Sequence, residues 1–351
     1  MSTDTIPAVC PELGIEVPVS QIEKELHKLW EKDDARTNAS LINFAVYSER
    51  HGGILENSAI LRDLTREHAC RALLIEVDRS VTEPSLRAWI TAHCHLSQGR
   101  KSVCCEQVAF RLTGRVTGRF RNTIFAHLNS DLPLVFWWQG ELSDVFSERL
   151  VAVIDRLIVD SSSWKDPRSS FETMIGNAKW NDDLIIQDLA WTRTWQYRVG
   201  VASLFDDPVA QAALPEIDTV NLTYRPGNRN SALQLIAWLT VQAGWTPVSQ
   251  SGSPLSFRAK NGNTISLHLT ADENSAPIGK LELHSRNAIL RVACDAGSTH
   301  LVREIEADQY KVSSHSPADP DTPAELLALQ LSRGGKNSLY QKILPRFLEL
   351  L

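Results

Sequence analysis

The first half of the chain alternates short β-rich apolar runs with helical segments. The run Leu41 to Tyr47 precedes a helical segment at residues 58–68, and the run Arg71 to Val77 follows that segment. Two apolar runs separated by a helix are typical of a βαβ unit, whose strands form a sheet that helices cover. The pattern therefore predicts an α/β domain with a mixed sheet covered by helices.

Further elements extend this N-terminal domain, which we assign to residues 20–210. Ser20 to Glu23 form a capping-box pattern, which predicts a helix that runs to about Lys32. Residues 1–19 are expected to form a flexible N-terminus, and the segment between Pro208 and Pro215 is expected to join the two domains. Strands are expected at residues 88–96, 103–113, 132–138 and 156–159, and helices at residues 118–129, 169–177 and 188–205.

The second half follows the pattern of an α+β domain, which we assign to residues 211–351. A strand at residues 218–224 leads into a helix at Ser231 to Ala243, in which Ser231 and Gln234 form a second capping-box pattern. Short alternating runs then predict an antiparallel meander, and Asn261-Gly262 between the first two runs is a hairpin signal. The runs lie at residues 255–259, 264–269, 280–284, 288–294 and 300–306.

Two helices are expected to close the chain. The first begins at Thr322-Pro323, where a capping residue is followed by proline at the first helical position. The second begins at Ser338, and Pro345 is expected to kink or shorten it because proline cannot donate the backbone hydrogen bond of a helix interior. The whole chain is thus predicted to be an α/β domain followed by an α+β domain.

Composition and charge argue against several classes of protein. The 351 residues include 36 Lys and Arg against 42 Asp and Glu, and this net charge of -6 argues against a nucleic-acid binder that relies on many phosphate contacts. The longest apolar run, Leu132 to Trp138, is far shorter than the roughly 20 residues that span a bilayer, so no membrane association is expected. No secretory signal pattern opens the sequence, and a cytoplasmic location follows as the default.

The sequence contains no complete catalytic motif. No G-x-G-x-x-G follows a strand, and neither a P-loop nor a G-x-S-x-G pattern occurs, so dinucleotide, nucleoside triphosphate and hydrolase sites lack their signatures. His93 and His95 would share one face of a strand without further ligands nearby, which favours a structural role over a metal site. We therefore predict no catalytic residues, no cofactor and no metal.

The six cysteines are dispersed, and most are expected to be buried small hydrophobes. Cys104 and Cys105 are candidate redox thiols. Because neighbouring residues of a strand point to opposite faces, one core thiol and one surface thiol are favoured over a mutual disulfide. A thiol switch between one of them and a distant cysteine is the alternative.

A basic island stands out in the otherwise acidic chain. Arg111, Arg115, Arg119 and Arg121 form a candidate anion patch, which could receive a phosphate or the acidic surface of a partner. The other interpretation is a solvated connection between a strand and a helix. Both interpretations stay open at the level of the sequence.

Tryptophan is unusually frequent, with 10 residues. Trp137 and Trp138 lie in a run so apolar that both are expected in the core. Trp191 and Trp195 are four residues apart and would share one face of a helix, whereas Arg193 would point elsewhere and be free to contact a partner. Core packing and a partner interface are both open for this helix.

Several sequence blocks, taken in order, resemble one family. The most specific patterns are L-P-x-x-x-W-W, D-R-L-I-V-D-S and D-L-A-W-T-R. Over about residues 20–245 the chain resembles the OpcA family, the glucose-6-phosphate dehydrogenase assembly proteins. The blocks are Arg36 to Phe44, Arg71 to Leu74, Cys105 to Val108, Leu132 to Trp138, Asp155 to Ser161 and Asp188 to Arg193.

This resemblance implies a non-catalytic accessory protein that binds glucose-6-phosphate dehydrogenase, promotes its active oligomeric state and regulates the oxidative pentose phosphate pathway. It also implies that thiol redox state is linked to this regulation in photosynthetic members. We expect Arg193→Glu to weaken the association without unfolding the protein. The alternative function is a sugar-phosphate-binding sensor or enzyme that uses the basic island from Arg111 to Arg121. The candidate partner interface comprises Arg156, Asp160, Ser161, Asp188, Trp191, Arg193 and Trp195.

Overall fold

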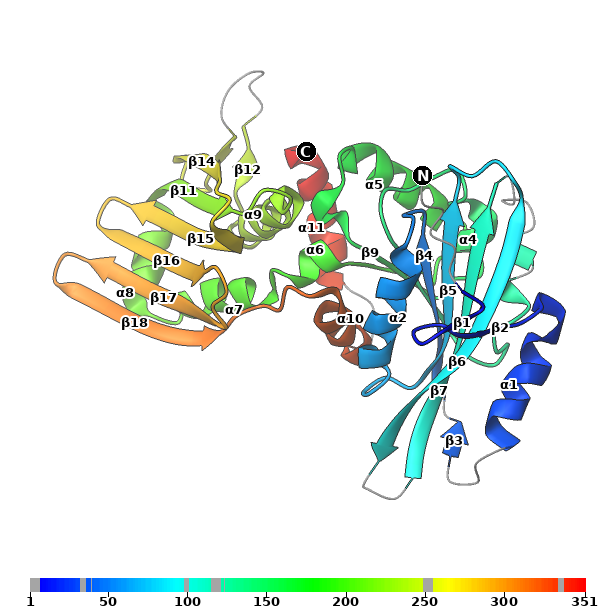
Figure 1. Cartoon of the computed structure of the whole chain (residues 1–351). Coiled ribbons are helices and arrows are strands. Elements are labelled where there is room, and N and C mark those ends of the chain that lie inside the picture. Colours follow the sequence, from blue (N-terminus) through cyan, green and yellow to red (C-terminus); the bar gives the residue numbers. More distant parts are fainter. Residues whose placement is uncertain are drawn as a thin grey trace. The chain divides into compact units, whose positions relative to one another are not determined.

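The chain divides into two compact units, each drawn from three separate stretches of sequence (Figure 1). Unit 1 comprises Met1–Val159, Ser170–Gln187 and Pro323–Gly334, and unit 2 comprises Asp160–Ser169, Asp188–Thr322 and Gly335–Leu351. The structure is a computed structural model, and it describes residues 7–31, 36–38, 40–97, 101–114, 121–122, 124–248, 255–333 and 338–351.

The predicted junction between Pro208 and Pro215 does not separate the two units. These residues form the helix α8 (Pro208–Ala213) and the 3-10 helix η3 (Leu214–Glu216), both inside unit 2. Asp207 caps α8 by accepting a hydrogen bond from the backbone of Val209. The prolines of this segment therefore begin helices, as proline does at the first helical position, rather than marking a linker.

Unit 1 is built on a mixed sheet that is ten-stranded in the described part of the chain. Its order is β1-β2-β6-β7-β5-β4-β8-β9-β10, and β3 also pairs with β7. The strands are β1 (Val9–Cys10), β2 (Gly14–Glu16), β3 (Arg36–Asn38), β4 (Ile42–Ser48), β5 (Cys70–Asp78), β6 (Ser85–Ser97), β7 (Lys101–Thr113), β8 (Leu134–Trp138), β9 (Arg156–Val159) and β10 (Ile185–Asp188).

The central strands of unit 1 have the order of a doubly wound sheet. β4 pairs in parallel with both β5 and β8, β5 pairs in parallel with β7, and β8 pairs in parallel with β9. In chain order the run β7-β5-β4-β8-β9-β10 reads 3-2-1-4-5-6. Such strands are covered on both faces, and accordingly all five residues of β8 are buried, Trp137 and Trp138 among them. The prediction that these two tryptophans belong to the core is confirmed.

Helices accompany this sheet, although one crossover is a strand. α2 lies between β4 and β5 and packs on β5, whereas β6 takes the place of a helix between β5 and β7. α2 begins five residues before the expected segment at residues 58–68. Of the helix expected at residues 118–129, residues 118–120 and 123 lie outside the described residues. The described helices before β10 are η1 (Val19–Gln21), α1 (Ile22–Glu31), α2 (Gly53–Leu64), α4 (Glu148–Val151) and α5 (Pro167–Ala178), together with η2 (Ser161–Ser163), which belongs to unit 2.

Unit 2 is built on a second mixed sheet, which is eight-stranded in the described residues. Its order is β12-β13-β14-β11-β15-β16-β17-β18. The strands are β11 (Ile217–Tyr224), β12 (Thr246–Pro247), β13 (Ser256–Arg258), β14 (Thr264–Ala271), β15 (Ser275–Ser285), β16 (Ala288–Asp295), β17 (His300–Ala307) and β18 (Tyr310–Pro317).

The predicted meander corresponds to the antiparallel strands β15 to β18. The sheet as a whole is mixed because β11 pairs in parallel with β14. Asn261-Gly262 lies in the turn between the antiparallel β13 and β14, where Gly262 adopts a φ of 92° that favours glycine. β18 was not expected, because its sequence Y-K-V-S-S-H-S-P has little of the apolar alternation that indicates a half-buried strand.

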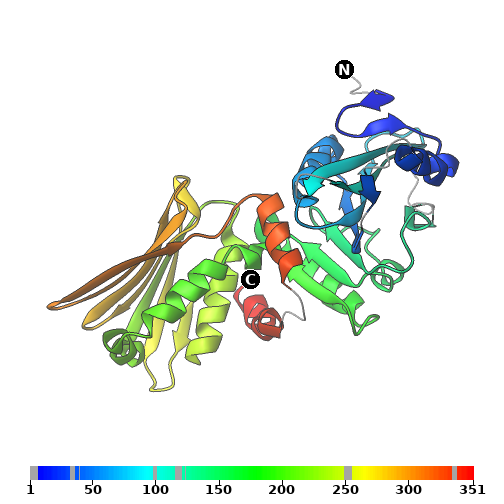
Figure 2. The same cartoon turned by 90° about the horizontal axis from the view of Figure 1, so that it is seen from below.

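The helices of unit 2 gather on one face of its sheet (Figure 2). α7 packs on β16 and β17, α8 on the same two strands, and α9 on β11 and β15. The helix expected at residues 188–205 is broken, because α6 ends at Thr192 and α7 begins at Trp195. The helices are α6 (Leu189–Thr192), α7 (Trp195–Leu204), α9 (Arg229–Ala243) and α11 (Ser338–Leu350), while α10 (Pro323–Ser332) belongs to unit 1.

The last helix does not end at its proline. α11 runs from Ser338 to Leu350 with Pro345 inside it, so the expected shortening does not occur. Tyr340, Ile343 and Phe347 are buried along this helix, which packs on α9. Burial of these side chains stabilises the helical course on both sides of the missing hydrogen bond. None of the described helices combines the length and the hydropathy of a bilayer-spanning segment.

Candidate functional site

The carboxyl ends of the parallel strands in unit 1 form the edge at which a doubly wound sheet ordinarily binds its ligand. β4 ends there at Ser48, β5 at Asp78 and β7 at Thr113. The strand order reverses around β4, and α2 begins at Gly53, shortly after β4 ends. The side chains at this edge are therefore the first to consider for ligand chemistry.

The N-terminus of α2 is occupied by a carboxylate of the protein. Gly52, which precedes the helix, offers no side chain as a cap. Instead, Glu76 on β5 accepts a hydrogen bond from the backbone N–H of Ile54 at 2.9 Å, and Glu76 is only 1% exposed. The first turn of a helix carries partial positive charge and favours an anion. Glu76 thus fills the position that the phosphates of a dinucleotide take in sheets of this kind.

Arg111 on β7 balances the charge of Glu76. Its Nε lies 3.3 Å from Glu76 Oε1, and its Nη2 lies 3.1 Å from His51 Nδ1. His51 Nδ1 lies 2.9 Å from Asp78 Oδ2, while Ser80 donates two hydrogen bonds to Asp78 Oδ1. The bonds from Ser80, followed by the contact with His51, hold the pKa of Asp78 below its ordinary value. Glu76, Arg111, His51 and Asp78 thus form one connected cluster, in which His51 is exposed to solvent.

Other charged side chains around the same edge also form ion pairs with side chains of opposite charge. Nη1 of Arg79 lies 2.7 Å from Asp144 Oδ1, and its Nη2 lies 3.1 Å from Glu49 Oε1. Arg50 pairs with Glu56 on α2. An incoming phosphate would therefore meet carboxylates that already hold the nearby cations, and it would find Glu76 on the amide of the first helical turn. This arrangement is unfavourable for a dinucleotide, and the sequence after β4 does not have the G-x-G-x-x-G pattern of a dinucleotide site.

The basic island does not provide an open anion patch at Arg111. This residue is buried and holds Glu76, so its assignment to such a patch is wrong. The reason is that Arg111 lies on β7, an interior strand of the sheet. There the carboxylate of Glu76 on the neighbouring strand β5 neutralises its charge. Arg121 is half-buried, and Arg115 and Arg119 lie outside the described residues.

Two of the sequence blocks meet in a buried network inside unit 2. The carboxylate of Asp188 is fully buried and accepts hydrogen bonds from the backbone and hydroxyl of Ser161 and from the backbone of Ala190. The side-chain amide of Gln234 donates to it at 2.7 Å, and the hydroxyl of Tyr340 at 3.3 Å. Burial raises the pKa of Asp188, and the bonds from Ser161 oppose that effect. The network joins segments that lie far apart in the chain.

Arg193 belongs to the interior of unit 2. Its two terminal nitrogens donate to the two oxygens of Asp160 at 2.9 and 2.8 Å, and its Nε lies 3.4 Å from Asp321. Only 7% of Arg193 is exposed. The prediction that Arg193 is free to contact a partner is therefore wrong, because the break between α6 and α7 turns its side chain toward Asp160.

The two tryptophans of this segment differ in exposure. Trp191 is 3% exposed, with the guanidinium of Arg198 lying 3.4 Å from its ring centroid. Trp195 at the start of α7 is 38% exposed. The guanidinium of Arg198 also lies 5.5 Å from the ring centroid of Trp195, so both rings flank one side chain although the helix is broken between them.

The structure thus divides the candidate partner interface. Burial leaves Ser161, Asp188, Trp191 and Arg193 almost no surface to present to a partner. Arg156 is half-buried on β9 and donates to the backbone oxygens of Gln330 and Arg333. Large apolar surface in the set is left only at Trp195.

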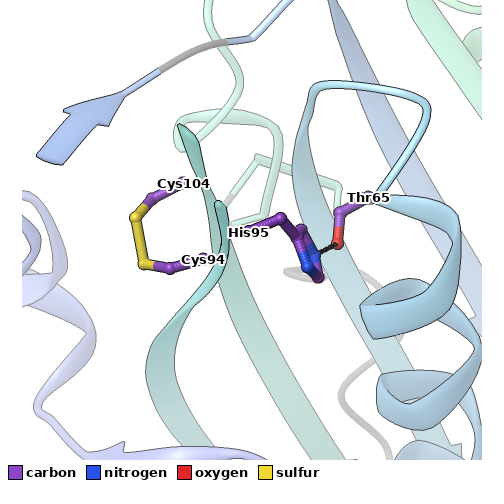
Figure 3. Close-up of a disulfide and its surroundings, with 4 residues drawn as sticks. All are labelled: Thr65, Cys94, His95 and Cys104. Carbon is purple, nitrogen blue, oxygen red and sulfur yellow. Dashed lines mark hydrogen bonds between the residues drawn. A yellow bond between two sulfur atoms is a disulfide. The ribbon is translucent and has the colours of Figure 1, made fainter. Parts of the chain in front are cut away.

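A disulfide joins Cys94 on β6 to Cys104 on β7 (Figure 3). The two residues are direct partners in the antiparallel ladder. Cys105 is a free, buried thiol whose pKa is raised by burial. Of the two candidate redox thiols, only Cys104 takes part in a disulfide, and the expectation that one of the two lies at the surface is wrong because both are buried.

The histidines beside the disulfide are held by side chains of unit 1. His95 lies on the opposite face of the strand from the disulfide, with its Nε2 3.0 Å from Thr65 Oγ1 (Figure 3). His93 Nε2 lies 2.9 Å from Gln107 Oε1. Within the described residues, no three His, Cys, Asp or Glu side chains gather as metal ligands would. A structural role for both histidines stays the favoured interpretation.

Two family models match successive parts of the chain. Residues 61–175 match the N-terminal domain, and residues 185–344 the C-terminal domain, of the glucose-6-phosphate dehydrogenase subunit, OpcA. Together they span well over half of the sequence. The chain belongs to the OpcA family.

Curated OpcA relatives match most of the chain. The OxPP cycle protein OpcA of Synechocystis sp. is 25% identical over 85% of this chain and 66% of its own length. The OpcA proteins of Synechococcus elongatus and Nostoc punctiforme are 23% and 29% identical, over 83% and 75% of this chain and 69% and 61% of their own lengths. The chain therefore spans about two thirds of the length of these relatives.

Solved structures of other proteins resemble this chain more distantly. An aldose-aldose oxidoreductase from Caulobacter crescentus is 13% identical, with a TM-score of 0.47 over 87% of this chain and 90% of that one. An inositol dehydrogenase homolog from Azotobacter vinelandii is 12% identical, with a TM-score of 0.43 over 88% and 85%. At these values neither resemblance carries an inference about this OpcA-family chain.

The sequence offered only partial signals for these clusters. Ser161 and Asp188 lie in the blocks that carry the resemblance to OpcA proteins, but their partners Gln234 and Tyr340 do not. The capping-box pattern of Ser231 and Gln234 does not mark the start of the helix, because α9 begins at Arg229 and buries both residues. For Glu76, the sequence feature that indicates a special role is its position as a charged residue inside the apolar run of β5.

Proposed function

We propose that this OpcA-family chain is a non-catalytic accessory subunit that binds glucose-6-phosphate dehydrogenase and promotes its assembly into the active oligomeric state. The observation that carries the proposal is the match of both parts of the chain to the glucose-6-phosphate dehydrogenase subunit. Such a subunit acts by binding one oligomeric state of the enzyme more tightly than the others, which shifts the population toward that state.

The carboxyl edge of unit 1 supports a role without catalysis. In a doubly wound dehydrogenase this edge holds the nicotinamide cofactor at the start of the first helix. Here Glu76 occupies the amide of Ile54, and Arg111 neutralises Glu76 from the neighbouring strand. Cofactor phosphates would have to displace a buried carboxylate that is already paired, which is costly. The edge is therefore better suited to stabilising unit 1 than to hydride transfer.

The exposed side of α7 is the contact that we propose for the enzyme. Trp195 and Val199 lie one turn apart on this helix, and they are 38% and 44% exposed. Residues four apart on a helix share a face, and exposed aromatic residues are enriched among the energetically dominant contacts of protein interfaces. This surface replaces Arg193 as the focus of the candidate interface.

The proposal is tested by mixing the purified chain with its cognate glucose-6-phosphate dehydrogenase. We expect co-elution in size-exclusion chromatography, a larger mass for the enzyme oligomer, and higher dehydrogenase activity than in the enzyme alone. We also expect the chain to show no such activity by itself. Two proteins that elute separately, with enzyme activity unchanged across a concentration series, would contradict the proposal.

A pair of variants tests the contact surface. Trp195→Ala is expected to weaken the association at least about tenfold, as the loss of a large interface aromatic residue does. Trp180→Ala is the matched control, because Trp180 is 63% exposed and lies in unit 1 outside the proposed surface. Titrations followed by light scattering compare the two variants. Equal affinity of Trp195→Ala and the parent chain would exclude α7 as the contact.

A further inference from the structure

One face of the unit-2 sheet lies opposite its helices. Leu281, Leu283, Leu290 and Val292 point toward α7, α8 and α9 and are buried. Because side chains of a strand alternate between faces, the residues between them point the other way. Among the described residues, the helices of unit 2 leave that other face uncovered (Figure 2). We call it the open face.

The open face carries a row of alternating charges across neighbouring strands. Glu282, Arg291 and Glu304 are successive partners in the ladder from β15 to β17. Arg291 lies 2.7 Å from Glu282 and 2.5 Å from Glu304. Their side chains are 11%, 27% and 20% exposed, respectively. In ladder order the full row from β11 to β18 is Asn221, Glu282, Arg291, Glu304 and Ser313.

The two rows that flank the charge row mix apolar and charged residues. On one side, Lys280 is followed by Ala293 and Val302, and Thr223 precedes it. On the other side, His284 is followed by Ile289, Glu306 and Lys311, and Thr219 precedes it. A sheet face that is permanently solvated is expected to carry long charged side chains throughout. The open face instead places the apolar side chains of Ile289, Ala293 and Val302 beside a charge row that is already paired within the chain.

This charge row matches its own copy under a twofold axis. An axis in the plane of the face, parallel to the strands and midway between β15 and β16, places each row over the same row of the copy. Glu282 then lies over Arg291 of the partner subunit, and Arg291 over Glu282 of the partner subunit. Asn221 lies over Glu304 of the partner subunit, and Lys280 over Ala293 of the partner subunit. No two like charges meet in these three rows.

The extent of the face agrees with a stable dimer. Six strands from β14 to β18, β11 included, lie side by side, and five of them are eight residues long. At about 4.8 Å between strands and about 3.3 Å per residue, they cover about 750 Å². A standard protein interface buries about 800 Å² on each partner. The proposed axis runs through the centre of these six strands, where overlap of the two copies is greatest.

We infer that the open face of the unit-2 sheet is the interface between two copies of this chain. Because Arg291 is already paired within each copy, its charge enters the interface with its partners in place, which lowers the cost of removing it from water. Packing of two such faces is the ordinary way in which sheets pair, with strand directions within about 30° of each other. The inference does not depend on the proposed partner enzyme, since it concerns the isolated chain.

Sedimentation equilibrium on the isolated full chain tests this inference. We expect a reversible monomer-dimer equilibrium with a dimer of twice the 39.2 kDa chain mass. Val302→Arg adds an unpaired charge to the open face and is expected to raise the dissociation constant at least about 30-fold. Val153→Arg is the matched control, because Val153 is 46% exposed and lies in unit 1. Thermal melts followed by circular dichroism verify that both variants fold.

A charge exchange tests the twofold arrangement itself. Arg291→Glu places Glu over Glu282 of the partner subunit and is expected to abolish the dimer. Adding Glu282→Arg to the same chain restores opposite charges across the axis and is expected to restore it. If Arg291→Glu fails to fold, Val302→Arg still decides the question.

Other results would overturn the inferred dimer or separate it from the proposed function. A chain that stays monomeric at about 100 µM, or a dimer that survives Val302→Arg, would overturn the inference. A monomeric chain in which Val302→Arg abolishes binding of glucose-6-phosphate dehydrogenase would assign the open face to that enzyme instead. Failure of the dimer with intact enzyme binding would leave the proposed function standing.

Discussion

The guanidinium of Arg193 makes two parallel hydrogen bonds to Asp160, at 2.9 and 2.8 Å, although 33 residues separate them in the chain. A bidentate pair of this kind is among the stronger charged contacts in proteins. Burial raises the pKa of Asp160, but the charge of Arg193 outweighs that effect and holds the pKa below its ordinary value. The pair therefore stabilises the ionised carboxylate in the folded state.

Removal of this guanidinium is expected to destabilise the protein. Arg193→Met leaves the carboxylate of Asp160 without its main partner, and we expect the free energy of unfolding to fall by about 3 kcal/mol. Arg66→Met is the matched control, because the side chain of Arg66 is 64% exposed and its ion pair with Asp63 lies at the surface. The control is expected to change stability by less than about 0.5 kcal/mol. Urea unfolding of both variants measures the difference, and equal midpoints would contradict a structural role for Arg193.

The same pair predicts a dependence on pH. A carboxylate whose pKa is lowered by folding contributes stability above its ordinary pKa of about 3.9, and this contribution is lost as the pH falls through the folded-state value. The deficit of Arg193→Met is therefore expected to be largest near pH 7 and to shrink below about pH 4. Urea midpoints at a series of pH values test this direction. A deficit that stays constant with pH would show that Arg193 acts through packing alone.

The roles of these residues could be predicted only in part from the sequence. The blocks containing Asp160, Ser161, Asp188 and Arg193 were recognisable, yet their spacing did not show that they converge. Convergence depends on the turn after β9 and on the break between α6 and α7, where Arg193 and Thr194 leave the regular helix. Thr194 donates its hydroxyl hydrogen bond to the backbone of Trp191 at this break. A local contact of that kind has no distinct signature in hydrophobic periodicity.

At the scale of elements, strongly apolar strands were the most predictable. β4, β5 and β8 lie close to their expected positions because their residues are buried on both faces and form continuous apolar runs. β18 was missed for the opposite reason, since it is a polar strand at the edge of its sheet. The parallel pairing of β11 with β14 was also outside the prediction, because register between distant strands is set by the whole sheet.

The hairpin of β6 and β7 carries the disulfide, and reduction is expected to weaken this element. Cys94 and Cys104 are 10 residues apart in sequence. A disulfide that closes a loop of about this length stabilises a protein by up to about 3 kcal/mol, because it lowers the conformational entropy of the unfolded chain. Cys94 is exposed and accessible to a soluble reductant, whereas Cys104 is buried. We therefore expect reduced protein to unfold at lower denaturant concentration than oxidised protein.

A double variant provides the control for this prediction. Cys94→Ser with Cys104→Ser is expected to unfold at the lower denaturant concentration both with and without reductant. Hydrogen exchange in β6 and β7 should rise on reduction, while exchange in the unit-2 sheet should not. If reductant shifts the double variant as much as the parent chain, another cysteine is responsible.

At the scale of the whole molecule, the two units share one interleaved chain. Unit 2 takes Asp160–Ser169 from before β10 and Gly335–Leu351 from the C-terminus, in addition to its central stretch. The sequence changes to a serine-rich stretch directly after Asp160, where the first crossing lies, but a loop of this kind does not by itself show that the chain passes from one unit to the other. A domain boundary inferred from loops and prolines therefore fell inside unit 2, at α8.

The interleaving predicts how fragments of the chain behave. The fragment 211–351, cut at the boundary expected from the sequence, lacks α6, α7 and half of α8; these helices pack on α9 or on the strands β16 and β17. It also leaves Gln234 and Tyr340 without Asp188 and Ser161, so buried polar groups lose their partners. The fragment 160–351 contains every stretch of unit 2. We expect cooperative thermal unfolding, followed by circular dichroism, only for 160–351. Cooperative unfolding of 211–351 would show that the central stretch folds without the segments that cross to it, and would restore the boundary near residue 210.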